Sequence, residues 1–228
     1  MKAITVWQPW AGAMAAGIKE NETRSWATKY RGPIAIHAGK KQIPLPWDGV
    51  LDDPTWRLFY KILGRHGINL YYESGMVPPD NYEYKLKYGE VIAIAELVDC
   101  IRITPEYITT LTPDELALGD YTPGRYAWKL ANVQKLPEPI PAKGRQGLWN
   151  WDALLLRHKG RDSWDRPVYE DENGKIWKDV EPRADDEPKL CSALYNAFDG
   201  EPDTPLEVME RYKNKAIVFI PKRDTWTW

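Results

Sequence analysis

The sequence predicts an α+β protein that is mainly β, a small β-barrel with flanking helices followed by a small C-terminal α+β module. Three observations predict this class. Short apolar runs are separated by turns rich in Pro and Gly, only one or two short helices interrupt them, and the character of the chain changes beyond Arg157. The long helices between strands that would indicate a parallel βαβ sheet are missing from the pattern.

The first 38 residues are expected to form three strands and one helix. The helix is Ala-rich, and Gly17 stands where a helix C-terminus favours a residue with positive φ. Alternation along the second strand puts Glu22, Arg24 and Trp26 on one face. The expected strands cover residues 3–6, 21–26 and 34–38, and the helix covers residues 10–16.

The rest of the barrel is expected around an insertion at residues 39–88, which contains one amphipathic helix at residues 55–63. The clearest strand follows at residues 90–103, and its nearly continuous apolar run predicts burial on both faces. Thr112-Pro113 predicts a helix start within residues 104–118. The remaining strands and edge segments are expected at residues 126–133, 137–141 and 147–151.

The C-terminal module shows a hairpin, a helix and a strand. Residues 167–169 and 176–178 flank Asn173-Gly174, the strongest short hairpin signal. Thr204 as N-cap and Pro205 in the first turn predict a helix at residues 206–212, and a closing strand is expected at residues 216–220.

Net charge and aromatic content indicate which kind of nucleic-acid partner the chain could bind. The 228 residues carry a net charge of −2, with 18 Lys and Arg against 16 Asp and Glu in residues 1–150, and 13 against 17 in residues 151–228. A protein that grips duplex DNA through many phosphates would be far more basic. The 12 Trp and 13 Tyr against 3 Phe suit stacking on bases, although more than half are expected to fill the core.

Neither a metal, a cofactor nor a membrane is expected. Cys100 and Cys191 lie in no CxxC or Cys/His cluster, so two reduced thiols in a cytoplasmic protein are expected. No run approaches the roughly 20 apolar residues of a membrane span. The N-terminal apolar run is interrupted by Gln8 and Pro9, which favours strand, turn and helix over a signal peptide.

One stretch carries a family signature. It reads Gly17-Ile18-Lys19-Glu20-Asn21-Glu22-Thr23-Arg24 and resembles the G-x-K-x-x-E-x-R motif of the ASCH family, whose domains share the PUA-like RNA-binding fold. Further blocks follow in the family's order: Trp7-Gln8-Pro9-Trp10, Gly124-Arg125-Tyr126-Ala127-Trp128, Pro139-Ile140-Pro141 and Gly147-Leu148-Trp149. The resemblance implies an ASCH domain at residues 1–155 with the insertion at 39–88, and an appended module at 160–228.

The resemblance also implies a ligand cleft at the motif. Lys19, Glu22 and Arg24 concentrate three charges, which on their own could equally be an exposed salt-bridge trio of little energetic weight. In ASCH domains these positions line a cleft in the barrel, where they would meet RNA or a nucleoside or nucleotide ligand. Other candidate ligand-binding residues are aromatic, polar or basic side chains near the motif: Trp7, Gln8, Trp10, Trp26, Tyr30, Arg31, His37 and Trp128.

Binding and catalysis both remain open at this point. Some ASCH-like proteins are amidohydrolases of N4-acetylated cytidine, with a Thr nucleophile where this chain has Glu22, and Thr23 points to the opposite face. A variant hydrolysis would use Glu22 to activate water and Lys19 to steer it, and a ribonuclease would use Lys19 with His37. The missing hydroxyl counts against the amidohydrolase mechanism, so a binding module is favoured while a hydrolase or ribonuclease stays the alternative.

The acidic C-terminal module has two possible roles. Its segment 200–205 resembles small appended modules of phage and mobile-element proteins, which implies a phage or bacterial source. Such a module either stabilises the barrel or contacts a protein partner, and the net charge of −4 over residues 151–228 would repel phosphate.

Overall fold

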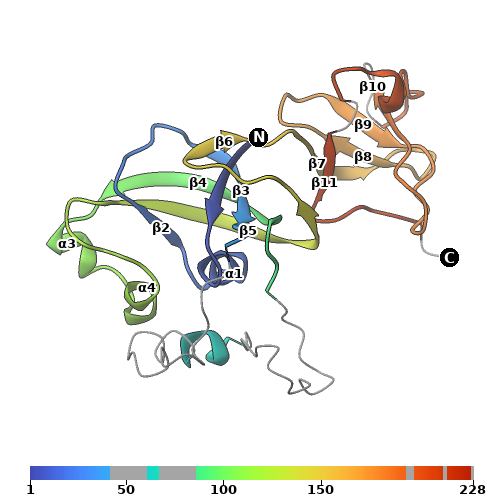
Figure 1. Ribbon diagram of the computed structural model, residues 1–228. Helices are drawn as coiled ribbons and strands as arrows, with labels where there is room; N and C mark the ends of the chain where they lie inside the picture. Colours follow the sequence, from blue (N-terminus) through green and yellow to red (C-terminus); the bar gives the residue numbers. More distant parts are fainter. Residues whose placement is uncertain (42–60, 67–85, 194–197, 213–214, 227–228) are drawn as a thin grey trace. The chain divides into compact units, whose positions relative to one another are not determined.

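The computed structural model describes residues 1–41, 61–66, 86–193, 198–212 and 215–226. The chain divides into two compact units, one of Lys2–Asn150 and one of Trp151–Trp228 together with Met1 (Figure 1). Each unit is built on one sheet, six-stranded in the first and five-stranded in the second. The mainly β class is therefore confirmed, while the domain limits at residues 155 and 160 stay a prediction.

The sheet of the first unit curls into an open barrel. Its strands run in the order β2-β5-β4-β3-β1-β6, with β1 and β3 parallel and the other pairs antiparallel. Arg24 in β2 donates from Nη2 to the Thr5 carbonyl of β1 over 2.9 Å, although three strands separate β1 and β2 in the sheet. β1 and β2 are therefore not paired as strands, and a side-chain hydrogen bond connects them across the opening, which we call the seam. The strands are β1 (Lys2–Val6), β2 (Asn21–Arg24), β3 (Gly32–Ala38), β4 (Glu90–Arg102), β5 (Tyr126–Pro141) and β6 (Leu148–Asn150).

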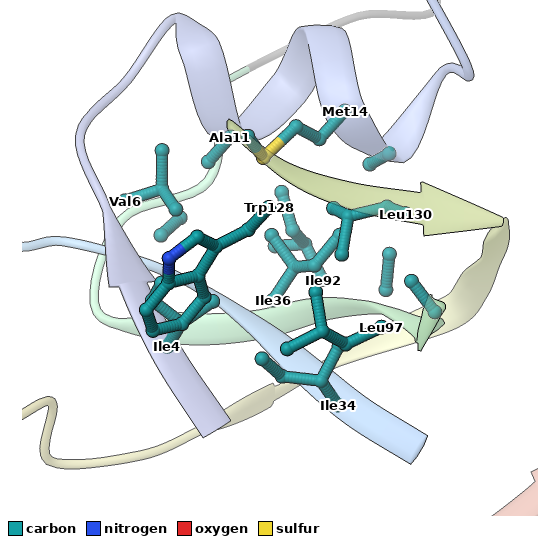
Figure 2. Packing of buried hydrophobic residues seen from close by; sticks show 14 residues of the cluster. Ile4, Val6, Ala11, Met14, Ile34, Ile36, Ile92, Leu97, Trp128 and Leu130 are labelled. Carbon is teal, nitrogen blue, oxygen red and sulfur yellow. The ribbon is translucent and has the colours of Figure 1, made fainter. Parts of the chain in front are cut away.

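Helix α1 (Trp10–Ala15) packs against strands β3, β4 and β5 of this sheet. Figure 2 shows Ala11 and Met14 of the helix above Trp128 and Leu130 of β5. Ala11, Met14 and Trp128 are completely buried, and Trp128 is among the largest buried side chains. Burial of this apolar face is the main stabilising contribution to the unit, since transfer from water is worth about 25 cal/mol per Å².

Two short helices connect β4 to β5. They are α3 (Pro105–Ile108) and α4 (Pro113–Ala117), and the Thr112 side chain accepts from the Glu115 amide, which confirms the predicted helix start. Residues 61–65 are helical, and Ile62 and Leu63 are buried in a cluster with Leu118. The rest of the helix expected at residues 55–63 lies outside the described residues, as does most of the insertion.

The long strands depart from the prediction in two ways. β5 is continuous where two segments were expected. Beyond Leu130 its only described partner strand is β4, so its other edge is unpaired. Prolines, which have no N–H to donate, are tolerated at such an edge. In β4, burial on both faces holds for Val91–Ala95 but fails at Glu96 and Val98, which are exposed.

The second predicted strand ends at Arg24, so Trp26 lies in the bend that follows.

The second unit has the strand order β10-β9-β8-β7-β11, with β7 and β11 parallel. The predicted hairpin is confirmed, since β8 and β9 pair antiparallel and the Asp171 carboxylate accepts from the amides of Asn173 and Lys175. The closing strand is also confirmed as β11. The strands are β7 (Ala153–Arg161), β8 (Pro167–Glu170), β9 (Ile176–Asp179), β10 (Leu190–Ala193) and β11 (Ala216–Ile220), and the first and fourth of these were not predicted.

The predicted helix at residues 206–212 is wrong. Only one 3-10 turn forms there, η3 (Leu206–Val208), and the Thr204 side chain does not cap it. The backbone before the turn is already engaged, because the Thr204 carbonyl accepts from Ser192 and Pro205 bridges to β10. Extended pairing at Thr204 and Pro205 therefore competes with helix initiation and prevails.

Candidate functional site

A pocket of about 600 Å³ opens at the seam between β1 and β2. We call it the seam pocket. It lies where the barrel lacks strand pairing, between the end of β1, the strand β2 and the loop after α4. Its lining residues are Thr5, Val6, Trp7, Trp10, Lys19, Glu22, Thr23, Arg24, Ala117, Leu118, Gly119, Asp120 and Arg125.

The end of α1 brings Lys19 into this pocket. Gly17 adopts a φ of +72° and donates to the Met14 carbonyl, while the Ile18 amide donates to Ala13, so the chain reverses directly after the helix. Lys19 follows at once and is 1% exposed. The turn that the sequence encodes with Gly17 thus places an ammonium group inside the unit.

Lys19 is buried, and its Nζ lacks a hydrogen-bond partner among the described residues. Its Nζ lies 3.7 Å from the Glu115 carboxylate and has no hydrogen-bond acceptor among the described residues. Burial lowers the pKa of Lys19, and the carboxylates of Glu115 and Glu22 partly offset this effect. A Cβ on Gly119 would lie 3.0 Å from this Nζ, so only glycine leaves the ammonium its present space. A hydrogen-bond acceptor that enters the pocket would supply the partner that Lys19 Nζ lacks.

Glu115 is held rigidly on the other side of Lys19. Its carboxylate accepts from the amides of Glu20 and Asn21 over 2.8 and 3.1 Å, and from the Tyr121 hydroxyl. Burial and the neighbouring carboxylate raise the pKa of Tyr121, so this hydroxyl stays a donor. These donors fix the counter-charge of Lys19 in place without occupying the pocket.

Glu22 and Arg24 form the second charged pair of the pocket. Arg24 Nη2 lies 2.9 Å from the Glu22 carboxylate and also donates to the Thr5 carbonyl. Burial raises the pKa of Glu22, and Arg24, Lys19 and Arg125 oppose that shift. The Nε of Arg24 is buried and has no acceptor among the described residues. The pair is thus partly satisfied and retains donor capacity.

A second, larger hollow of about 1050 Å³ adjoins the first. We call it the basic groove. It shares Thr5, Trp7 and Arg24 with the seam pocket, so the two form one continuous surface. Its lining residues are Thr5, Trp7, Arg24, Trp26, His37, Gly39, Lys40, Gly89, Pro141, Ala142, Lys143, Gly144, Arg145, Gln146 and Gly147.

His37 lies under the basic groove as a neutral ring. Its Nε2 is 3.1 Å from the Ala142 carbonyl, and burial, helped by Lys40, lowers its pKa. A neutral ring whose Nε2–H donates to Ala142 leaves Nδ1 as an acceptor, and this atom is buried without a partner among the described residues. Gly144 packs so close that a Cβ there would meet the ring at 2.4 Å.

The family model of the ASCH domain matches residues 4–140. This chain belongs to the ASCH family. Activating signal cointegrator 1 of Homo sapiens and that of Mus musculus are each 26% identical to it over 157 residues. The matched region covers 69% of this chain but only 23% of the length of either relative.

The ASCH motif residues converge in the structure. Trp7, Trp10, Lys19, Glu22 and Arg24 line the seam pocket. The basic groove adds two more of the residues expected from the sequence, Trp26 and His37.

Four expected residues of the ASCH domain line neither hollow. The amide of Gln8 accepts from Gly12 and donates to the Lys87 carbonyl, which ties α1 to the chain before β4. Tyr30 donates to the Pro33 carbonyl, and Arg31 forms an exposed pair with Asp99.

Trp128, the fourth of them, is buried in the core beneath Trp26. Its Nε1 donates to the Trp26 carbonyl over 3.3 Å, and the two rings meet edge to face with centroids 4.6 Å apart. Trp128 therefore positions Trp26, which is 38% exposed, at the groove.

The sequence did not reveal Glu115, Arg125 or the loop from Lys143 to Gly147 as part of the site. Glu115 was visible only as a helix-start residue, and its contact with Lys19 spans 96 positions of the chain. The loop did carry a signal, because two basic residues alternate with Gly144 and Gly147 directly before the Gly147-Leu148-Trp149 block.

Within the described part of the chain, no group of three or more His, Cys, Asp or Glu side chains is placed to hold a metal ion. The same residues include no helix long and apolar enough to cross a membrane.

Proposed function

We propose that this ASCH domain binds single-stranded RNA and takes one nucleobase into the seam pocket. The observation that carries the proposal is Lys19, a buried ammonium that lines the pocket and has no hydrogen-bond acceptor among the described residues. An unsatisfied buried donor costs about 1–3 kcal/mol, and more when charged, so a ligand acceptor at this position is strongly favoured.

The other residues of the seam pocket fit a base edge. In its ionised form Glu22 only accepts hydrogen bonds, and in its protonated form Lys19 only donates them. This combination complements the adjacent donor and acceptor on a Watson–Crick edge. Trp7 and Trp10 supply aromatic faces, and Trp7 is 50% exposed. The Lys41 ammonium lies 4.5 Å from the centroid of the Trp7 ring, so a stacked base would use the other face of Trp7.

The decisive experiment measures affinity for a short single-stranded RNA. Lys19→Met is expected to weaken binding about tenfold or more, because a hydrogen bond from a charged group contributes about 1.5–3 kcal/mol. Trp7→Ala is expected to cost about 1–3 kcal/mol through lost stacking. Lys29→Met is the matched control, since Lys29 is exposed on the same unit and lines neither hollow. Equal affinity of the Lys19 and Lys29 variants would refute the assignment.

A second candidate is hydrolysis of a modified nucleoside such as N4-acetylcytidine. It is favoured by the opposite pKa shifts of neighbouring Lys19 and Glu22, which is the pattern of an acid and a base in one site. Glu22 would take a proton from a water that Lys19 steers to the acetyl carbonyl, and would pass the proton to N4 as the C–N bond breaks to give acetate and cytidine. Turnover of N4-acetylcytidine that disappears in Glu22→Gln would establish this activity, and its absence in the wild-type chain leaves binding alone.

The acidic module, expected at residues 160–228, is proposed to stay off the RNA and to serve either as a stabilising extension or as a contact for a protein partner. Its net negative charge supports this, because like charges repel phosphate. The exposed Asp185 and Asp186 lie in its acidic segment. Replacing both by Asn is expected to change RNA affinity by less than about twofold at physiological salt, since screening acts within about 8 Å.

A further inference from the structure

The basic groove has the electrostatic character of an anion site. Arg24, Lys40, Lys143 and Arg145 line it, and no Asp or Glu is among the lining residues that the structure describes. Among the described residues, Lys40, Lys143 and Arg145 form no ion pair with a carboxylate. Residues 1–150 carry almost balanced charge, so four basic side chains around one hollow are a local concentration of positive charge.

The backbone of the groove adds donors to these charges. The amides of Lys143, Gly144, Arg145 and Gln146 donate to no group among the described residues. Gly144 lies against the His37 ring and Gly147 adopts a φ of +69°, so both glycines shape this loop in a way that larger residues would disturb. Successive backbone amides without a described acceptor, flanked by Lys and Arg, are an arrangement that can bind phosphate oxygens.

The groove also continues into the seam pocket. Thr5, Trp7 and Arg24 belong to both, so a ligand with its base in the seam pocket would extend its next group toward the groove. Nη2 of Arg24 is bound to Glu22 and Thr5, while its Nε has no acceptor among the described residues. Arg24 therefore stands at the junction of a base site and an anion site.

We propose that the basic groove is a phosphate site that holds the phosphate groups adjoining the nucleoside in the seam pocket. The nucleoside part of this statement rests on the proposed function, whereas the phosphate part stands on the groove alone. The phosphates are either those of a nucleotide or RNA end, or the internal phosphodiesters of a chain. Both present the same oxygens to Lys143, Arg145 and the loop amides.

The first experiment adds inorganic tripolyphosphate to the full chain and follows backbone amide shifts by NMR. Shifts centred on residues 142–147 are expected in the wild-type protein. The double variant Lys143→Ala/Arg145→Ala is expected to bind at least about tenfold more weakly, and Lys29→Ala/Lys129→Ala is the charge-matched control with both sites outside the groove. All four side chains are exposed, so the fold should survive. Shifts located elsewhere, or equal affinity of the two double variants, would overturn the proposal.

The second experiment separates the two phosphate sources with one short RNA bearing either a 5′-phosphate or a 5′-hydroxyl. If the groove binds a terminal phosphate, the phosphorylated form binds more tightly and Lys143→Ala/Arg145→Ala abolishes the difference. If it binds internal phosphodiesters, both forms bind alike. The double variant then reduces the slope of log K against log[salt] by about 1.4 in magnitude, because each of the two lost contacts accounts for about 0.7. An unchanged salt dependence with no end preference overturns the proposal.

The two proposals fail in different ways. If Lys19→Met leaves RNA affinity unchanged while tripolyphosphate still shifts residues 142–147, the base site in the seam pocket is refuted and the phosphate site stands. If Lys19→Met weakens RNA binding while the Lys143 and Arg145 substitutions do nothing, the phosphate site is refuted and the base site stands.

Discussion

Replacing Glu115 by Gln tests whether the site depends on a fixed counter-charge for Lys19. The substitution keeps the size of the side chain but removes its charge, and it places an NH2 group where one of the carboxylate oxygens now accepts. The Glu20 and Asn21 amides, the Tyr121 hydroxyl and Lys19 all direct donors or positive charge at this carboxylate. A buried cation would then lose its partner.

The expected cost follows from these contacts. Breaking a buried ion pair by removing one partner costs about 3–5 kcal/mol, and Glu115 and Lys19 are 5% and 1% exposed. At a urea m-value of about 2 kcal/mol/M, the unfolding midpoint of the first unit should fall by about 1.5–2.5 M. The pKa of Lys19 should fall further, because Glu115 is the largest influence that raises it. RNA affinity should therefore decline at a lower pH than in the wild-type protein.

The assay combines urea unfolding with hydrogen exchange at two amides. Exchange at Glu20 and Asn21 reports the site locally, because both amides donate to Glu115. The control is Asp114→Asn, one residue earlier on α4, where the carboxylate forms an exposed pair with Arg65. If Glu115→Gln changes stability and exchange no more than Asp114→Asn does, the carboxylate does not anchor Lys19 and the reasoning is refuted.

Four further changes are expected to have defined effects. Asp162→Ala should destabilise the second unit by about 3–5 kcal/mol in urea, because it removes the carboxylate partner of buried Lys178 and leaves Arg166 only its longer contact with Glu201. Gly144→Ala should cost about 1–3 kcal/mol by forcing a Cβ against the His37 ring, and should weaken tripolyphosphate binding by calorimetry. Thr112→Ala should cost about 1 kcal/mol in urea by removing the α4 cap. The pKa of Glu22 is higher in the folded than in the unfolded chain, so protonated Glu22 stabilises the fold below about pH 4.5. This contribution to the free energy of unfolding is lost as the pH rises through the raised pKa. Glu22→Gln should abolish this pH dependence, measured by urea unfolding at a series of pH values.

The fold was predictable where local patterns agree with tertiary pairing. The apolar run at Val91–Ala95 and the Asn173-Gly174 turn each encode their element within a few residues, and both form as expected. The helix expected after Pro205 does not form, because the capping signal at Thr204 competes with a strand partner 12 positions earlier in the chain, at Ser192. Local propensity is a weak prior, and a long-range hydrogen bond outweighs it.

The candidate site was predictable in part for the same reason. Lys19, Glu22 and Arg24 lie within six residues, so turn and alternation alone bring them together. Glu115 reaches Lys19 only through the packing of α4, and Arg145 reaches the groove only because the chain returns beside β1 through β6. Contacts between residues so far apart in the chain leave no periodic pattern in the sequence.

The open seam explains why a charged site can exist inside so small a barrel. If β1 and β2 paired directly, their backbone groups would satisfy one another and close the space that Lys19 and Glu22 now share. Arg24 replaces that pairing with a side-chain hydrogen bond to Thr5, which holds the two strands in reach and leaves room for a ligand. Buried charge is costly without partners, and here the internal partners, Glu115 and Arg24, satisfy only part of it. The donors of Lys19 and Arg24 that lack a described acceptor lie at the gap in the strand pairing, so the proposed ligand would bind where the barrel itself is left open.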